Sequence, residues 1–260
     1  MNKYYAYART EFLQRISNTT NFLGWGGFLG VIMFIYFNLY GTVYGPGQTI
    51  QGYTFTQVIW YVGFAQMINL AMHGNRLRDI GNDVRTGEIA TTLTKPVNYA
   101  KKEISILFGV AAQRLSLLLP LITVFAYSFV GPLQVQPTQF AALLTWPLAI
   151  LLTSTITVTI GLTSFWLEQT RAARFIYSKL RFIAGGMLVP LDFYPESVQT
   201  VLQYTPFPYM IYEPINAFMN YDALNLVHVL STQIIWITLT ATMLHLVYTN
   251  GLSKLGVNGG

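Results

Sequence analysis

Apolar and polar positions alternate along the chain in long blocks. Six apolar blocks approach the roughly 20 residues that a helix needs to cross about 30 Å of hydrocarbon. We therefore expect an all-α integral membrane protein, with a single transmembrane domain over residues 1–260. The predicted spans are about 22–40, 54–74, 104–130, 140–166, 172–191 and 224–248.

The fifth of these spans has the weakest pattern. Its uncharged run, residues 182–191, is too short to cross as a helix by itself. The predicted helix must therefore begin near Ala172 and hold its basic residues at the membrane surface.

Two shorter patterns flank the spans. Residues 3–16 place Tyr4 and Phe12 near one helical face and Arg9 away from it. This predicts an amphipathic helix in the membrane interface, with a short solvated lead-in as the alternative. Five prolines between residues 190 and 214 break the region before the last span, so we expect short re-entrant helices there.

Composition and charge support a membrane protein. Hydrophobic residues make up 53% of the chain and charged residues only 10%, against about 25% in ordinary soluble proteins. With six spans, all 15 Lys and Arg fall on the side that holds both termini. The positive-inside rule makes that side cytoplasmic. Because these bases are divided among short loops, we do not expect a nucleic-acid partner.

The hinge between the second and third spans, residues 75–103, holds ten charged residues. Within it, Thr86 is predicted to cap a short helix over residues 87–94, with Glu88 in the first turn. Ile89 and Leu93 then share one face, and Pro96 ends the helix. Such a stub could insert into a groove on a partner protein, and a solvated loop is the alternative.

Catalytic motifs are missing from the sequence. It has no GxxxxGK[ST] segment for nucleotide phosphates and no cysteine, and its three histidines lie far apart along the chain. All acidic residues fall in loops or at span ends, which argues against a carrier driven by ion binding at the midplane. We therefore predict that the chain is not an enzyme and that energy for any transport comes from elsewhere.

A few polar residues lie inside or beside the spans. Gln66, Asn69 and His73 share one face of the second span, where we favour hydrogen bonds between helices over substrate contacts. Arg114 and Glu168 lie at cytoplasmic ends of their spans and are candidates for an ion pair. The alternative is that each side chain reaches the headgroups by itself.

Three sequence blocks resemble ABC type-2 permeases, the six-span subunits of ATP-binding-cassette exporters. They are RTGEIATTLTKPVNY at 85–99, SFWLEQT with RFIYSKLRFIAGGMLVPLDFYPESVQTVLQYTPFPYMIYEP between 164 and 214, and GLSKLGVNGG at the end. The resemblance extends over most of the chain.

The resemblance implies two permeases, identical or closely related, on two cytoplasmic ATPase subunits. It implies that residues 86–94 form a coupling helix that sits on the ATPase, with the N-terminal helix alongside. ATP and Mg²⁺ are then expected on the ATPase, and this chain is expected to bind no cofactor or metal. The expected coupling residues are Arg85, Thr86, Gly87, Glu88, Ile89, Leu93, Lys95 and Pro96.

The resemblance also implies that the second and fifth spans face the dimer axis. That would place Gln66, Asn69, Gly185 and Gly186 near the transport path, with re-entrant helices as an outer gate. We expect an exporter of amphipathic or lipid-like molecules in a prokaryotic cytoplasmic membrane. The alternative is a membrane scaffold or immunity-type protein that binds one partner and transports nothing.

Overall fold

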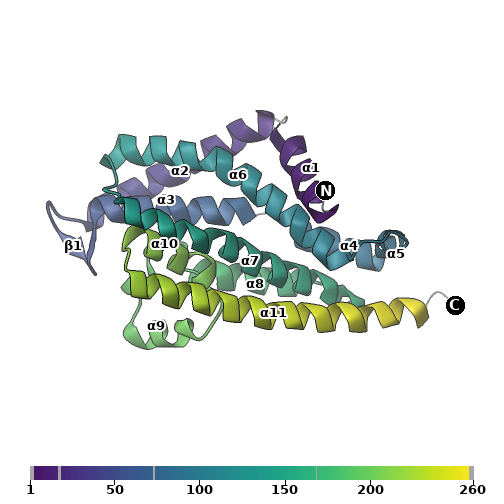
Figure 1. The fold of residues 1–260 in the computed structure, drawn as a ribbon. Helices are drawn as coiled ribbons and strands as arrows, with labels where there is room; N and C mark the ends of the chain where they lie inside the picture. Colours follow the sequence, from purple (N-terminus) through teal and green to yellow (C-terminus); the bar gives the residue numbers. More distant parts are fainter. Residues whose placement is uncertain (1–2, 17–18, 73, 168, 258–260) are drawn as a thin grey trace.

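Long helices run side by side and define the long axis of the molecule (Figure 1). The computed structural model describes residues 3–16, 19–72, 74–167 and 169–257. The long helices are α2 (Thr19–Val43), α3 (Phe55–Met72), α6 (Tyr99–Val130), α7 (Thr145–Leu162) and α11 (Ala223–Val257). An eight-residue 3₁₀ helix, η1 (Pro137–Leu144), leads into α7, and η2 (Thr163–Phe165) follows it.

Four helical segments in the described part of the chain are long and apolar enough to cross a membrane. They are Gly24–Val43, Tyr99–Val130, Pro137–Phe165 and Ala223–Lys254. These segments correspond to the first, third, fourth and sixth predicted spans. The protein is therefore mostly helical with four candidate spans by length and composition, and α3 and α8 are not among those four.

Helix α8 (Arg171–Ala184) is shorter than predicted. Its 14 residues make a helix of about 21 Å, less than the hydrocarbon thickness. The chain turns at Gly186, whose φ of +72° is left-handed and therefore ends the helix. The expected continuous span over residues 172–191 is wrong beyond Ala184.

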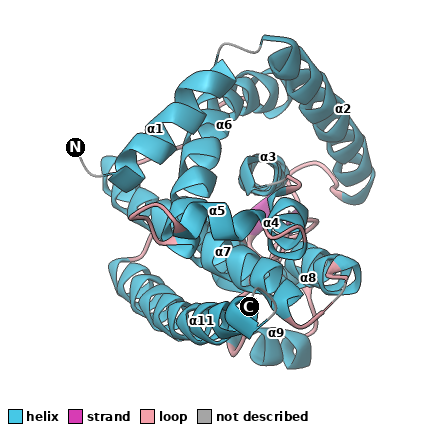
Figure 2. Ribbon diagram, turned by 90° about the vertical axis from the view of Figure 1, so that its right-hand side faces the viewer, coloured by secondary structure: helices cyan, strands magenta, loops and turns pink. Residues whose placement is uncertain are grey.

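Helix α3 lies in the centre of the molecule when it is viewed along the long axis (Figure 2). Almost its whole length is buried, from Val58 to Ala71. Gly63 allows close approach, because a Cβ atom there would lie 3.0 Å from the Ile122 side chain of α6. The second predicted span is thus a helix held inside the chain by its neighbours.

The two ends of the molecule differ in character (Figure 1). Helices α4 (Arg76–Arg85) and α5 (Glu88–Leu93) lie at one end, together with the C-terminal end of α11 and the start of α1 (Lys3–Ile16). The opposite end holds the hairpin β1 (Thr49–Ile50) and β2 (Tyr53–Thr54). It also holds α9 (Glu196–Gln203) and α10 (Tyr212–Met219). Both ends of the described chain therefore lie beside the basic hinge, as the charge pattern requires.

Helix α1 has the predicted bounds and packs on α6. The crossing is close at Gly109, where a Cβ atom would lie 2.2 Å from the Ala8 carbonyl oxygen. The predicted N-terminal helix is confirmed, whereas its place in the membrane interface stays a prediction.

The proline-rich region forms several short helices instead of one long helix. The chain there forms η3 (Leu191–Phe193), α9, η4 (Pro208–Met210) and α10. Tyrosine hydroxyls bind carbonyls of the irregular segment, from Tyr40 to Leu188 at 3.1 Å and from Tyr61 to Gly186 at 2.5 Å. Irregular backbone at membrane depth needs such partners. The predicted short helices are confirmed, and their re-entry into the outer leaflet stays a prediction.

Candidate functional site

Helix α4 forms the base of the hinge. Leu77, Ile80 and Val84 recur at i, i+3 and i+7, and all three are buried. This face lies against α7, where a Cβ atom on Gly161 would meet the Ile80 side chain at 2.7 Å. A glycine in α7 thus allows α4 to pack closely against a long apolar helix.

The turn between α4 and α5 is made by Thr86 and Gly87. The Thr86 hydroxyl donates a hydrogen bond to the Asn82 carbonyl at 2.9 Å, so Thr86 ends α4 and does not cap α5. The N-cap of α5 is Gly87, whose φ is +75°. The predicted Thr86 cap is therefore wrong, because a glycine in the left-handed conformation provides the sharp turn.

Helix α5 presents a different face from the one expected. Ile89 is 0% exposed and lies in one buried cluster with Leu107 of α6, Val158 of α7 and Leu244 of α11. Ile89 therefore anchors α5 to this chain and cannot insert into a partner. Leu93, in contrast, is 38% exposed. The exposed residues of this segment are Arg85, Thr86, Glu88, Ala90, Thr91, Leu93, Thr94, Lys95 and Pro96.

The segment that follows α5 is fastened to α1. The Lys3 ammonium donates to the Pro96 carbonyl, and the Asn98 backbone N–H donates to the Tyr4 hydroxyl at 3.2 Å. The Asn98 side chain caps α6 by accepting from the Lys101 N–H at 3.0 Å. The N-terminal helix therefore lies beside the hinge.

A buried polar cluster lies beneath α5. Glu103 is 0% exposed, and its Oε2 accepts hydrogen bonds from Arg76 at 2.5 Å. The Tyr99 hydroxyl donates to Asp83 at 2.6 Å, and the Lys102 ammonium lies 3.6 Å from Glu103 Oε1. These contacts join α4 to the first turns of α6.

The sequence analysis did not pair Arg76 with Glu103. The sequence did contain one signal for it. Glu103 is an acidic residue in the first turns of a long apolar helix, and an acidic side chain that is buried there needs a cation nearby. Burial lowers the pKa of Arg76, but the Glu103 carboxylate more than offsets this, and the pKa is raised overall. The Arg76 guanidinium is therefore charged where it contacts Glu103.

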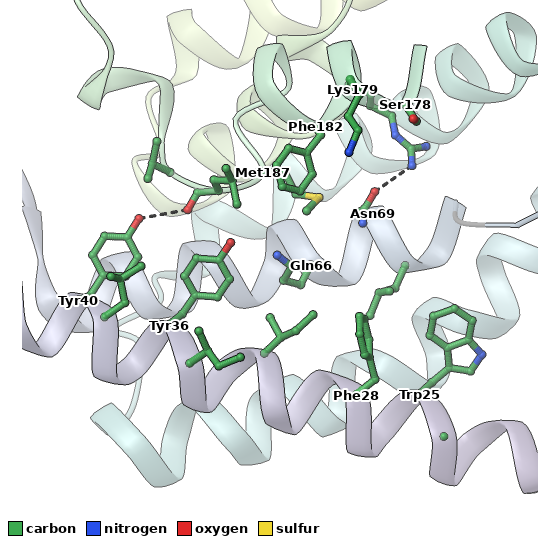
Figure 3. A pocket seen from close by; sticks show the side chains of 18 residues that line it. Trp25, Phe28, Tyr36, Tyr40, Gln66, Asn69, Ser178, Lys179, Phe182 and Met187 are labelled. Carbon is green, nitrogen blue, oxygen red and sulfur yellow. Dashed lines mark hydrogen bonds between the residues drawn. The ribbon is translucent and has the colours of Figure 1, made fainter. Parts of the chain in front are cut away.

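A cavity of about 1120 Å³ lies between α2, α3 and α8 (Figure 3). Its wall is mainly aromatic and aliphatic, and both Gln66 and Asn69 contribute to it. Gln66 comes from the middle of α3 and Asn69 lies one turn further along. The structure thus brings two of the four expected pathway residues to a single cavity.

Cationic groups from α8 line the same cavity. Arg181 donates to the Asn69 side-chain oxygen at 2.9 Å, and Lys179 points toward Asn69 (Figure 3). None of the described lining residues is acidic. Gly185 and Gly186 are buried in the turn after α8 and do not line the cavity, although the three residues that follow them do.

A comparison with known protein families shows the family to which the chain belongs. A model for the family described as ABC-2 family transporter protein matches residues 30–259. The chain belongs to the ABC-2 transporter family. Comparisons with curated proteins and with solved structures return no match.

Membership of the ABC-2 family identifies a multi-pass membrane protein that is the permease component of an ABC transporter. The family implies partnership with an ATP-binding-cassette ATPase, and its membrane permeases are typically non-catalytic. The family resemblance expected from the sequence is confirmed.

The suggested ion pair of this ABC-2 protein cannot be followed, because Glu168 lies outside the described residues. Arg114 donates to the Leu70 carbonyl at 3.0 Å and to the Ala71 carbonyl at 3.4 Å. Its guanidinium also lies 5.2 Å from the ring centre of Trp25. Arg114 therefore binds the last carbonyls of α3, where the helix dipole favours a cation.

At the end opposite the hinge, the ABC-2 protein has a second polar cluster. The hydroxyls of Tyr53 and Tyr212 donate to Asp192 at 2.9 and 2.8 Å. Partial burial, and to a smaller extent the Asp192 carboxylate, raises the pKa of Glu213 to about 7. Sequence reasoning did not find this cluster, since its members lie on three separate short elements.

Proposed function

We propose that this chain is the permease subunit of an ATP-binding-cassette exporter. It moves an amphipathic or lipid-like molecule outward, with ATP hydrolysed on Mg²⁺ by a separate cytoplasmic subunit. Closure of the ATPase subunits on ATP moves α5, and α5 moves the membrane helices. The membrane is a prokaryotic cytoplasmic membrane, with both termini on the ATPase side.

The two faces of α5 carry this proposal. Its inner residue Ile89 lies in a buried cluster to which α6, α7 and α11 contribute, whereas Glu88 and Leu93 are exposed. A single exposed leucine beside charged groups matches the small apolar contact of a helix that docks in a groove. Because Gly87 and Asn98 fix both ends of the segment, the docked helix is already ordered before a partner binds.

The cavity supports an amphipathic substrate. Its wall combines apolar side chains with a few polar groups, chiefly Gln66, Asn69 and Arg181. Sites of this composition bury an apolar body and orient one polar end. The cavity lies along α2, α3 and α8, so it also fits the proposed transport path.

The proposed topology has six crossings in a single domain. Helix α3 supplies the second crossing, since 18 residues span about 27 Å and the chain itself covers its polar groups. Helix α8 and the short helices after it supply the fifth, with the chain returning to the outer surface through α9 and α10. This arrangement keeps every Lys and Arg on the cytoplasmic side.

A second permease, identical or closely related, completes the proposed complex. Ile176, Leu180 and Ile183 form an exposed apolar face on α8 at i, i+4 and i+7. Partner permeases packed along this face would enclose the cavity between them. The complete transporter then has two permeases on two ATPase subunits.

The test compares Leu93→Asp with Leu224→Asp. Leu224 is 82% exposed at the opposite end of the molecule, so it controls for the effect of a new surface charge. We expect Leu93→Asp to lose ATPase co-purification and ATP-driven uptake of an amphipathic dye into inverted vesicles, with normal permease levels in the membrane. Leu224→Asp should retain both.

Glu88→Lys provides a second probe of the same surface, because it reverses the charge of an exposed side chain and leaves the packing of α5 unchanged. Docking through α5 is refuted if Leu93→Asp and Glu88→Lys both co-purify the ATPase and export dye at the wild-type rate. Permease that purifies with one non-ATPase partner, and never with an ATPase, would indicate the scaffold alternative instead.

A further inference from the structure

A small, strongly basic cleft lies between α4 and the start of α8, separate from the membrane cavity. Its volume is about 190 Å³. Arg78 and Arg85 of α4 line one side, and Arg171 and Arg174 of α8 line the other. None of the described residues that line the cleft is acidic. Four guanidinium groups therefore face one space that can hold a small anion.

The positions of the four arginines follow from helix geometry. Arg78 and Arg85 are seven residues apart on α4, and Arg171 and Arg174 are three apart on α8, so each pair shares a helix face. Within the described chain, neither Arg171 nor Arg174 forms an ion pair. Arg78 lies 3.7 Å from the Asp79 carboxylate and Arg85 donates to the Asn82 side-chain oxygen, so an anion in the cleft would mainly offset the charges of Arg171 and Arg174.

The chemistry of the cleft favours a phosphate group. Guanidinium groups bind phosphate oxygens through paired hydrogen bonds. Thr170, the N-cap of α8, makes no side-chain capping bond, so the first N–H groups of this 14-residue helix remain available to an anion. Amide groups from Asn82 and Gln169 add further donors.

The surroundings identify the source of the phosphate. Phe175 and Ile176 are exposed in the turn of α8 that follows Arg174, so exposed apolar side chains lie next to the basic residues along this helix. Trp166 and Leu167, which precede Gln169 of the cleft in the sequence, are also exposed, and tryptophan is enriched at the level of lipid headgroups. The cleft therefore lies where a headgroup of the cytoplasmic leaflet would reach it.

We infer that the four-arginine cleft binds the phosphate of an anionic phospholipid from the cytoplasmic leaflet. The headgroup bridges α4 to α8 while the acyl chains lie along Phe175. The bound lipid then holds the base of α5 against the start of α8. The inference uses the membrane orientation of the proposed function, but lipid binding requires neither the ATPase nor transport.

The experiment uses the full-length permease purified in mild detergent without an ATPase. Phosphatidylglycerol and phosphatidylcholine are added in turn, and the melting temperature and the number of retained lipids are measured by thermal shift and native mass spectrometry. We expect phosphatidylglycerol alone to raise the melting temperature and to be retained. In R171Q/R174Q the affinity for phosphatidylglycerol should fall about tenfold or more, as loss of charged hydrogen bonds predicts.

The matched control is R9Q/K101Q, which removes the same charge from exposed positions on the same side of the membrane. It should keep the wild-type response. Equal loss in both double variants, or equal stabilisation by the two lipids, overturns the site. Stabilisation by glycerol phosphate as strong as that by phosphatidylglycerol overturns the lipid as its source. If R171Q/R174Q binds lipid like the wild type and, in a separate purification with the ATPase, no longer retains the ATPase, the cleft belongs to a protein partner.

Discussion

The buried pair of Arg76 and Glu103 allows an asymmetric prediction about stability. Arg76 is 29% exposed and Glu103 is 0% exposed. In Arg76→Met the carboxylate loses both short hydrogen bonds and cannot reach water. In Glu103→Gln the guanidinium loses its counter-charge but can be partly rehydrated. We therefore expect Arg76→Met to be the more harmful change.

The magnitudes follow from the fate of the remaining charge. An uncompensated buried charge costs about 3 to 5 kcal/mol of stability. Because the Lys102 ammonium lies 3.6 Å from Glu103 Oε1 and partly offsets the charge, we expect Arg76→Met to lower the free energy of unfolding by about 3 kcal/mol. Glu103→Gln keeps the shape and should cost about 1 to 2 kcal/mol. The double variant removes both charges and should cost less than the sum, with a coupling energy of about 2 kcal/mol.

Thermal unfolding of the purified permease in detergent, followed by fluorescence-detected size exclusion, measures these differences. The order of melting temperatures should be wild type, Glu103→Gln, then Arg76→Met, with the double variant at or above Arg76→Met. Arg9→Gln serves as the control for loss of one exposed cation. Additive effects in the double variant, or equal losses in the two single variants, would refute the reasoning.

Two further predictions concern the part of the molecule away from the hinge. Gly186→Ala places a Cβ atom 2.9 Å from the Tyr61 hydroxyl at a left-handed φ, so it should cost about 2 to 4 kcal/mol, whereas Gly47→Ala, in open space, should cost about 1 kcal/mol. Equal melting temperatures for these two variants would contradict the packing argument. The pKa of Glu213, raised from 4.5 to about 7, means that the folded state binds more protons between these values, so stability should fall as pH rises through this window. Glu213→Gln should flatten this melting profile, and an unchanged profile would exclude Glu213 as its source.

The helices of the fold were predictable where the apolar pattern is long. The predicted spans at 104–130 and 224–248 lie within α6 and α11, and the predicted helix over residues 3–16 coincides with α1. The failure at α8 has a local cause, since apolar residues continue past Ala184 while Gly186 turns the chain. Hydropathy reports the environment of a segment, but backbone conformation decides where its helix ends.

The candidate site was less predictable than the fold. Periodicity placed Ile89 and Leu93 on one face, yet only the tertiary arrangement decides which of them meets the neighbouring helices of the same chain. Arg76 and Glu103 illustrate the same limit, because the two are 27 positions apart and are joined only when α4 packs beside α6. Local sequence rules indicate that a buried Glu103 needs a cation, but they do not say which cation the fold brings to it.

The burial of Ile89 changes how α5 can transmit movement. A short helix connected to the rest of the chain only at its two ends could tilt without disturbing the membrane helices. Here Ile89 is buried in a cluster that includes Leu107, Val158 and Leu244, and emptying the site of a buried isoleucine costs about 2 to 5 kcal/mol, so moving α5 out of this cluster is unfavourable. If α5 has the proposed coupling role, we therefore expect a force on Leu93 to be transmitted through this buried cluster to the helices that contribute to it.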